Sequence, residues 1–232
     1  MKGCLYLIPT PLGEMPLEYV IPEGTLAAVT GLKYFAVEEL RSGRRYLSKA
    51  GFKGKIDSLE LYLLNEHTKE EELEAILSVL ERGENVGLLS EAGLPAVADP
   101  GANLVMKAHN KGIKVVPFTG PSSLMLALMA SGKNGQNFSF IGYLPVKSDD
   151  RRSKIKELEK HVARSGQSQI MIETPYRNNA LLADFLQVCS DVTTLTVAAG
   201  ITTGSEFIAT KTIAQWKKER PELNKIPCVF IL

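Results

Sequence analysis

Short apolar runs of strand length alternate along this chain with segments whose apolar residues recur every three or four positions. In the first half, strands are predicted at residues 3–8, 34–37, 59–64, 86–89 and 114–118, and helices at 39–49, 69–82, 101–110 and 122–131. The helix at 69–82 has the clearest pattern, because Leu73, Ile76, Leu77 and Leu80 share one face. Repeated strand–helix–strand units of this length predict a largely parallel sheet with helices on both faces.

The pattern changes after about residue 118. Further strands are predicted at 138–143, 169–173, 193–198, 206–210 and 228–232, with a hairpin-like turn at Thr203-Gly204-Ser205. A charged helix is expected to begin within residues 147–160, with Ser148 or Asp149 as its N-cap. These patterns predict two α/β domains, residues 1–118 with a largely parallel sheet and residues 119–232 with a mixed sheet.

Composition places the chain among ordinary globular proteins, with 44% hydrophobic and 23% charged residues. Lys and Arg total 27 against 26 Asp and Glu, so net charge favours neither nucleic acid nor an acidic membrane, although a local basic surface is compatible with this sum. The three distant cysteines form neither a disulfide framework nor a CxxC motif. Because no signal peptide or membrane-length apolar run is visible, we expect a cytoplasmic protein with no membrane association.

Three loops at predicted strand ends carry the strongest chemical signal. They are PTPLGE at 9–14, SEAGLPAVADPG at 90–101 and TGPSS at 119–123. Glycine lets a backbone approach a ligand closely, proline stiffens a loop, and a helix start offers free N–H groups. Each loop alone is also typical of an ordinary strand–helix turn. Together, at the strand ends where open α/β sheets bind ligands, they predict a binding site.

Several common sites are absent from the sequence. There is no GxGxxG after the first strand and no GxxxxGK[ST], which disfavours dinucleotide and P-loop nucleotide binding. Neither HExxH nor GxSxG occurs. His67, His109 and His161 lack metal-ligand spacing to each other or to cysteine, so we expect no metal.

The order of the motifs resembles the tetrapyrrole methylase superfamily, and within it the bacterial small-subunit rRNA ribose methyltransferases. The segments that carry the resemblance, between Leu5 and about Gln187, are VEELRSGRRYLSKAGF (37–52), NEH (65–67), SEAGLPAVADPG (90–101), TGPSSLMLALMASG (119–132), FIGYLPVKSDDRR (140–152) and ETPYR (173–177). The resemblance implies a homodimer of two-domain subunits that binds S-adenosylmethionine between the domains and transfers its methyl group. It also implies cofactor contacts from Pro11, Leu12, Gly13, Ser90, Ala92, Gly93, Leu94, Pro95, Val97, Ser122, Ser123, Thr174 and Ala199.

The chain departs from the ribose methyltransferases mainly at positions expected to face the substrate. Gly13 is followed by Glu14 rather than Asn, Glu38-Glu39-Leu40-Arg41 replaces Glu-Asp-Thr-Arg, and residues 199–203 (AGITT) replace Arg-Glu-Leu-Thr-Lys. The sequence also ends at Leu232, before an additional C-terminal segment of those enzymes. These differences question the rRNA substrate more than the methyl donor.

An acceptor hydroxyl needs a base to take its proton. The candidates near predicted strand ends are Glu38, His67 and Glu91, and the candidates for RNA phosphate contact are Arg41, Arg44 and Arg45. The alternatives are a structural salt bridge between Glu38 and Arg41, a solvated helix face for the other arginines, and a capping role for His67. Three functions stay open: an rRNA ribose methyltransferase, a methyltransferase for a tetrapyrrole precursor or another metabolite, and a non-catalytic regulatory protein that binds S-adenosylmethionine.

Overall fold

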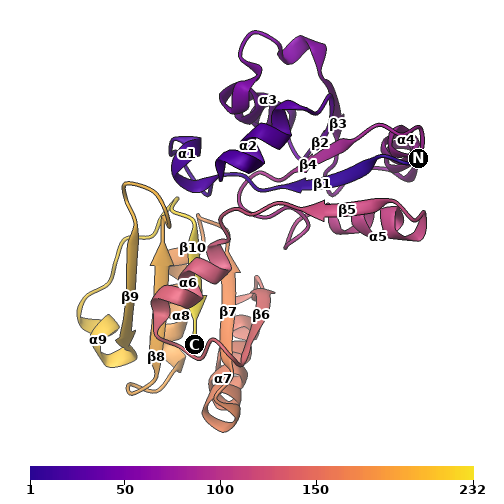
Figure 1. The fold of residues 1–232 in the computed structure, drawn as a ribbon. Coiled ribbons are helices and arrows are strands. Elements are labelled where there is room, and N and C mark those ends of the chain that lie inside the picture. Colours follow the sequence, from indigo (N-terminus) through magenta and orange to yellow (C-terminus); the bar gives the residue numbers. More distant parts are fainter. The chain divides into compact units, whose positions relative to one another are not determined.

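The computed structural model describes all 232 residues, whose contacts divide the chain into two compact units, Met1–Ser122 and Ser123–Leu232 (Figure 1). Each unit has its own five-stranded sheet and its own hydrophobic core. The prediction of two α/β folds, one with a parallel and one with a mixed sheet, is confirmed. None of the helices combines the length and the apolar character needed to cross a membrane.

The first unit is built on a parallel sheet. Its strands are β1 (Cys4–Ile8), β2 (Tyr34–Val37), β3 (Glu60–Leu63), β4 (Val86–Leu89) and β5 (Lys114–Pro117), in the order β3-β2-β4-β1-β5. All four neighbouring pairs are parallel, so the carboxyl ends of the strands meet at one edge. Since β1 and β4 are neighbours, the loops that follow them begin side by side.

Helices cover both faces of this sheet. They are α1 (Leu17–Val20), α2 (Glu23–Thr30), α3 (Leu40–Leu47) with a following π-helical turn (Ser48–Phe52), a 3-10 turn (Ile56–Ser58), α4 (Glu70–Glu81) and α5 (Ala102–Asn110). Tyr34 and Ala36 of β2 belong to the core formed with α4 and α5. Phe35 and Val37 belong to the opposite core, formed with α1, α2 and α3. Successive residues of a strand point to opposite faces, which explains why all of β2 is buried.

The second unit has a mixed sheet. Its elements are α6 (Ser123–Ser131), β6 (Phe138–Tyr143), α7 (Ser148–Ser165), β7 (Ser168–Glu173), α8 (Asn178–Val188), β8 (Thr194–Ala199), β9 (Phe207–Thr212), α9 (Ile213–Lys218) and β10 (Cys228–Ile231). The strand order is β6-β7-β10-β8-β9, and only β6 and β7 are parallel. The predicted hairpin is confirmed, since β8 and β9 pair from Thr194↔Thr212 to Ala199↔Phe207. The core gathers Phe185, Trp216 and Phe230, and Trp216 Nε1 donates to Leu195 O at 2.9 Å.

Two helix starts differ from the sequence pattern. The predicted charged helix forms as α7, but the N-cap prediction is wrong, because Lys147 occupies that position and Ser148 is already helical. The Ser148 hydroxyl instead donates to Asp184 of α8 at 3.3 Å, a partner far away in sequence. In α3, Glu39 is the N-cap, and its carboxylate accepts hydrogen bonds from Arg41 N at 2.8 Å and Ser42 N at 2.7 Å.

Candidate functional site

The loops after β1 and β4 are hydrogen-bonded to each other. Thr10 N donates to Gly93 O at 2.9 Å, and Gly93 N donates to Thr10 O at 3.0 Å. Thr10 Oγ1 donates to Ser90 O, and Ser90 Oγ donates to Gly93 O, both at 3.3 Å. Gly93 has a φ of +83°, and a Cβ there would lie 3.2 Å from Leu12 Cδ2. The two loops therefore form one preorganised surface that requires glycine at its centre.

A cavity of about 230 Å³ opens beside these loops. Five residues for which the resemblance implies cofactor contact line it: Pro11, Leu12, Gly13, Ser90 and Ala92. The candidate base Glu91 and the candidate phosphate-binding residue Arg45 also line it. Lys49 and Tyr46, to which the sequence analysis assigned no role, also line the cavity, and Lys49 adds a second positive charge beside Arg45.

The rest of the β4 loop lies outside this cavity. Pro95 is buried, Leu94 is half-buried, and Val97 is exposed. Ala96 and Ala98, on either side of Val97, have φ values of +66° and +57°. Alanine adopts this conformation only when the surrounding structure imposes it, and such strain is common at binding sites.

The third loop connects β5 to α6. It approaches the β1 loop so closely that a Cβ on Gly120 would lie 2.2 Å from Pro9 Cγ. Thr25 Oγ1 of α2 donates to Thr119 O at 3.3 Å and fixes the start of the turn. Ser122 is the last residue of the first unit, and Ser123 begins α6 in the second.

Three carboxylates gather beside the β4 loop: Glu38 follows β2, while Glu91 and Asp99 belong to the loop itself. Glu91 N donates to Glu38 Oε2 at 3.3 Å. Burial, reinforced by the charges of Glu38 and Glu91, raises the pKa of Asp99 to about 7. Burial also raises the pKa of Glu38 despite the Glu91 N–H, and the charges of Glu91 and Glu66 add to this rise. Asp99 is therefore partly protonated near neutral pH.

Asp99 is the functional candidate that the sequence analysis missed. In the sequence, its only signal was its place in an unusual loop. The burial and the nearby charges of Glu38 and Glu91 that raise its pKa arise only in the folded chain. Although the carboxylates lie close together, no three His, Cys, Asp or Glu side chains are arranged to hold a metal ion.

His67 stands apart from the carboxylates. Its side chain is 84% exposed, and Nε2 lies 3.5 Å from Glu66 Oε1. Its backbone N donates to Asn65 Oδ1 at 2.9 Å within the turn that follows β3. Of the three candidate bases, the structure brings Glu38 and Glu91 together and leaves His67 on the surface.

The start of α3 connects the carboxylates to a basic helix. Ser42 Oγ donates to Glu91 Oε1, and Tyr46 Oη donates to Pro9 O at 3.3 Å. These bonds attach the helix to both loops that line the cavity. Glu38 and Arg41 form no ion pair, so the salt-bridge alternative is not observed. The candidate phosphate contacts are all exposed and have no ion-pair partner: Arg41, Arg44 and Arg45.

The second unit brings Thr174 and Ala199 to one edge of its sheet. Glu173 and Ala199 both pair with Cys228 of the strand between them, so the loops after β7 and β8 start at the same level. The Glu173 side chain is fully buried, and its Oε1 accepts hydrogen bonds from Thr174 N and Arg177 Nη2, each at 2.6 Å. Thr174 is therefore fixed by a buried carboxylate.

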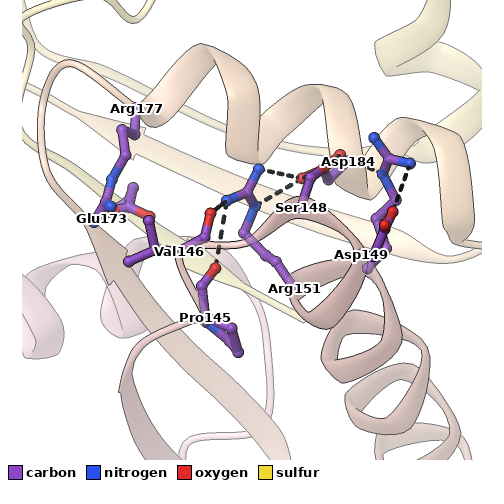
Figure 2. A network of polar contacts seen from close by, with 9 residues as sticks. Pro145, Val146, Ser148, Asp149, Arg151, Glu173, Arg177 and Asp184 are labelled. Atoms are coloured by element: carbon purple, nitrogen blue, oxygen red, sulfur yellow. Dashed lines mark hydrogen bonds and ion pairs between the residues drawn. The ribbon is translucent and has the colours of Figure 1, made fainter.

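A second polar network fixes the turn after β6. Figure 2 shows Arg151 of α7 directed at Asp184 of α8 and at the carbonyl groups of Pro145 and Val146. Arg151 Nη2 lies 2.6 Å from Asp184 Oδ2, and both side chains are buried. Arg151 therefore ties the turn at Pro145 and Val146 to α7 and, through Asp184, to α8.

Comparison with known proteins agrees with the resemblance seen in the sequence. A family model described as Tetrapyrrole (Corrin/Porphyrin) Methylases matches residues 37–216. Ribosomal RNA small subunit methyltransferase I of Vibrio cholerae is 31% identical over 231 residues, which cover 98% of this chain and 76% of the relative. The protein of the same name from Escherichia coli O157:H7 is 30% identical over 234 residues, or 100% of this chain and 78% of the relative.

Two solved structures share the fold. The methyltransferase CobJ has a TM-score of 0.66 at 15% identity and covers 100% of this chain and 94% of its own. The uroporphyrin-III-C-methyltransferase from Thermus thermophilus has a TM-score of 0.59 at 16% identity, with 100% and 92% coverage. At these identities the likeness shows the fold alone. Because the family model spans well over half of the sequence and a relative 31% identical spans nearly all of it, the chain belongs to the tetrapyrrole methylase family and is a methyltransferase.

Proposed function

We propose that this methyltransferase takes its methyl group from S-adenosylmethionine and transfers it to a ribose 2′-hydroxyl of small-subunit rRNA. The observation that carries the proposal is a single cavity lined by two glycine–proline loops, by Glu91, and by the basic residues Arg45 and Lys49. Such a site combines a rigid ligand-binding surface, a proton acceptor and cations suited to phosphate. The names of the V. cholerae and E. coli relatives support the rRNA acceptor.

The loops suit a cofactor that approaches the backbone closely. S-adenosylmethionine, when bound, supplies a methyl group on a positively charged sulfur that keeps the bonding electrons as the methyl leaves. Pro11, Leu12, Gly13 and Ala92 would hold it, because they offer backbone groups and small apolar surfaces in the cavity. The φ of +83° at Gly93 disfavours any residue with a side chain where the two loops meet. Contacts from Ser122, Ser123, Thr174 and Ala199, and a cytoplasmic homodimer, stay predictions from the resemblance.

The chain's own part in the reaction is to align the acceptor oxygen and to accept its proton. As this oxygen forms its bond to the methyl carbon, its proton passes to Glu91, the carboxylate that lines the cavity. Ser42 orients Glu91 from α3, and Glu38 contacts the Glu91 backbone. Asp99, whose pKa burial and the charges of Glu38 and Glu91 raise to about 7, is partly protonated near neutral pH and so adds less negative charge beside them.

Radiolabelled methyl transfer tests the proposal. The chain is incubated with labelled S-adenosylmethionine and, separately, with small ribosomal subunits, free small-subunit rRNA and uroporphyrinogen. We expect label in RNA, in nucleotides resistant to alkaline cleavage because the 2′-oxygen is methylated. Glu91→Gln should lower kcat about 100-fold, the usual contribution of a general base. His67→Asn should stay near wild type, because His67 is exposed and apart from the carboxylates.

The other outcomes separate the alternatives. Label in uroporphyrinogen alone would replace the rRNA acceptor with a small tetrapyrrole. Cofactor binding without transfer to any acceptor would favour a regulatory protein. Wild-type kcat in Glu91→Gln, with label in RNA, would remove Glu91 as the base and leave the acceptor standing.

A further inference from the structure

One segment of the first unit concentrates positive charge. Residues 41–55 contain six Arg and Lys residues and no Asp or Glu, whereas the whole chain has a net charge of only +1. We call this segment, RSGRRYLSKAGFKGK, the basic segment. All six basic side chains, Arg41, Arg44, Arg45, Lys49, Lys53 and Lys55, are exposed. None forms an ion pair, although Lys33, Lys107 and Lys111 of the same unit all do.

The basic segment has a fixed shape. Three of its own residues, Tyr46, Leu47 and Phe52, are buried in the core of the first unit. The Phe52 ring packs edge-on to Phe35, with the ring centroids 6.0 Å apart. Gly51, inside the π-helical turn, has a φ of +119°, and Gly54, after it, has a φ of +77°. These two glycines turn the chain and present Lys53 and Lys55. The cations are therefore carried on ordered backbone, which lowers the entropy cost of binding a partner.

The basic segment leads into the candidate site. Arg41 and Arg45 are four residues apart on α3, so they lie on one face about 6 Å apart along the helix axis. Arg45 and Lys49 both line the cavity that contains Glu91 and the β1 loop. A row of unpaired cations that runs from the surface to a reaction site is suited to a chain-like polyanion whose charges repeat along its length.

We infer that the basic segment binds the sugar–phosphate backbone of the RNA strand that carries the methyl acceptor. This inference rests on the proposed function and extends its phosphate contacts from Arg45 and Lys49 to the whole basic segment. Arg45 and Lys49 contact the phosphates next to the methylated nucleotide, and Lys53 and Lys55 contact phosphates farther along the strand. Because the rest of the chain has 21 Lys and Arg against 26 Asp and Glu, a net charge of −5, this localised positive charge orients the RNA toward the cavity.

The test compares two triple variants of the full chain. Lys49→Gln/Lys53→Gln/Lys55→Gln removes three charges from the basic segment. Lys156→Gln/Lys160→Gln/Lys218→Gln removes three exposed, unpaired lysines of the second unit and is the matched control. Affinity for a fluorescein-labelled single-stranded oligoribonucleotide is measured by anisotropy between 50 and 250 mM salt, about the range in which phosphate contacts dominate.

We expect the slope of log affinity against log salt to become shallower by about 2 in the first variant, at roughly 0.7 per lost phosphate contact on a single strand. The control should keep the wild-type slope, and Lys49→Arg/Lys53→Arg/Lys55→Arg should restore it. Far-UV circular dichroism confirms that each variant is folded. An unchanged slope in the first variant, or an equal change in the control, would overturn the inference.

Failure of the inference and failure of the proposed function give different results. If the wild type methylates RNA but the salt slope does not depend on Lys49, Lys53 and Lys55, the surface is wrong and the acceptor stands. If the slope depends on these lysines but no label enters any RNA, the surface stands and the proposed acceptor is wrong.

Discussion

Replacing Asp184 with alanine is expected to destabilise the second unit by about 3–5 kcal/mol, the usual cost of removing one partner from a buried ion pair. Its carboxylate accepts a hydrogen bond from Arg151 Nε at 2.7 Å (Figure 2) and another from Arg152 Nε at 2.8 Å. The Arg151 side chain is only 7% exposed. Without Asp184 this charge stays buried, with the carbonyl groups of Pro145 and Val146 as its remaining acceptors.

The pKa of Asp184 supports the same argument. Burial alone would raise it, but the hydrogen bonds and charges of Arg152 and Arg151 outweigh burial and lower it. A carboxylate with a lowered folded-state pKa stabilises the protein above its unfolded pKa of about 3.9, and this contribution is lost as the pH falls through the folded-state value. The free energy of unfolding of the wild type should therefore fall in acid as Asp184 is protonated, and Asp184→Ala should not show this part of the fall.

Tryptophan fluorescence during urea unfolding measures the effect. Trp216 is the only tryptophan, and it is fully buried in the second unit, so it reports on that unit. With a urea m-value of about 2 kcal/mol per M, the midpoint should fall by about 2 M. Asp149→Ala is the control, because Asp149 is 97% exposed and lies 3.6 Å from Arg152, so its loss should barely move the midpoint.

The double variant Arg151→Met/Asp184→Leu leaves no charge buried and should be more stable than Asp184→Ala. If Asp184→Ala and Asp149→Ala shift the midpoint equally, the buried pair does not stabilise this unit and the reasoning is refuted.

Two further predictions concern the first unit. Gly120→Ala should weaken S-adenosylmethionine binding at least about tenfold by calorimetric titration, because its Cβ would overlap Pro9 and displace the β1 loop, a loss of about 1.4 kcal/mol or more. Gly24→Ala, with no atom within 4 Å of the new Cβ, is the control, and equal affinities would contradict the prediction. Because the pKa of Asp99 is raised to about 7, its contribution to stability is present below its unfolded pKa and is lost as the pH rises through 7. Calorimetric melting should therefore show that the wild type loses stability relative to Asp99→Asn as the pH rises from about 4 to about 7, and parallel pH curves would argue against the raised pKa of Asp99.

Local pattern was sufficient for most of the elements. The predicted strands at 34–37 and 86–89 match β2 and β4, and the apolar face of α4 is buried as predicted. These features depend on side-chain periodicity, which neighbouring residues determine. The helix α2 was not predicted, since only Thr25 and Val29 are buried in it and this leaves no clear apolar stripe.

The sequence by itself determined the two α/β folds, the loops that line the cavity and the family, because each is encoded in short contiguous segments. The tertiary structure decided which charged groups act together. It placed Asp99 beside Glu38, added Lys49 to the cavity, left His67 exposed and directed Ser148 to Asp184 instead of the N-cap. These outcomes depend on contacts between residues far apart in the chain and on the burial those contacts create. Burial and proximity set the pKa values and the partners of polar groups, and no local pattern in the sequence records them.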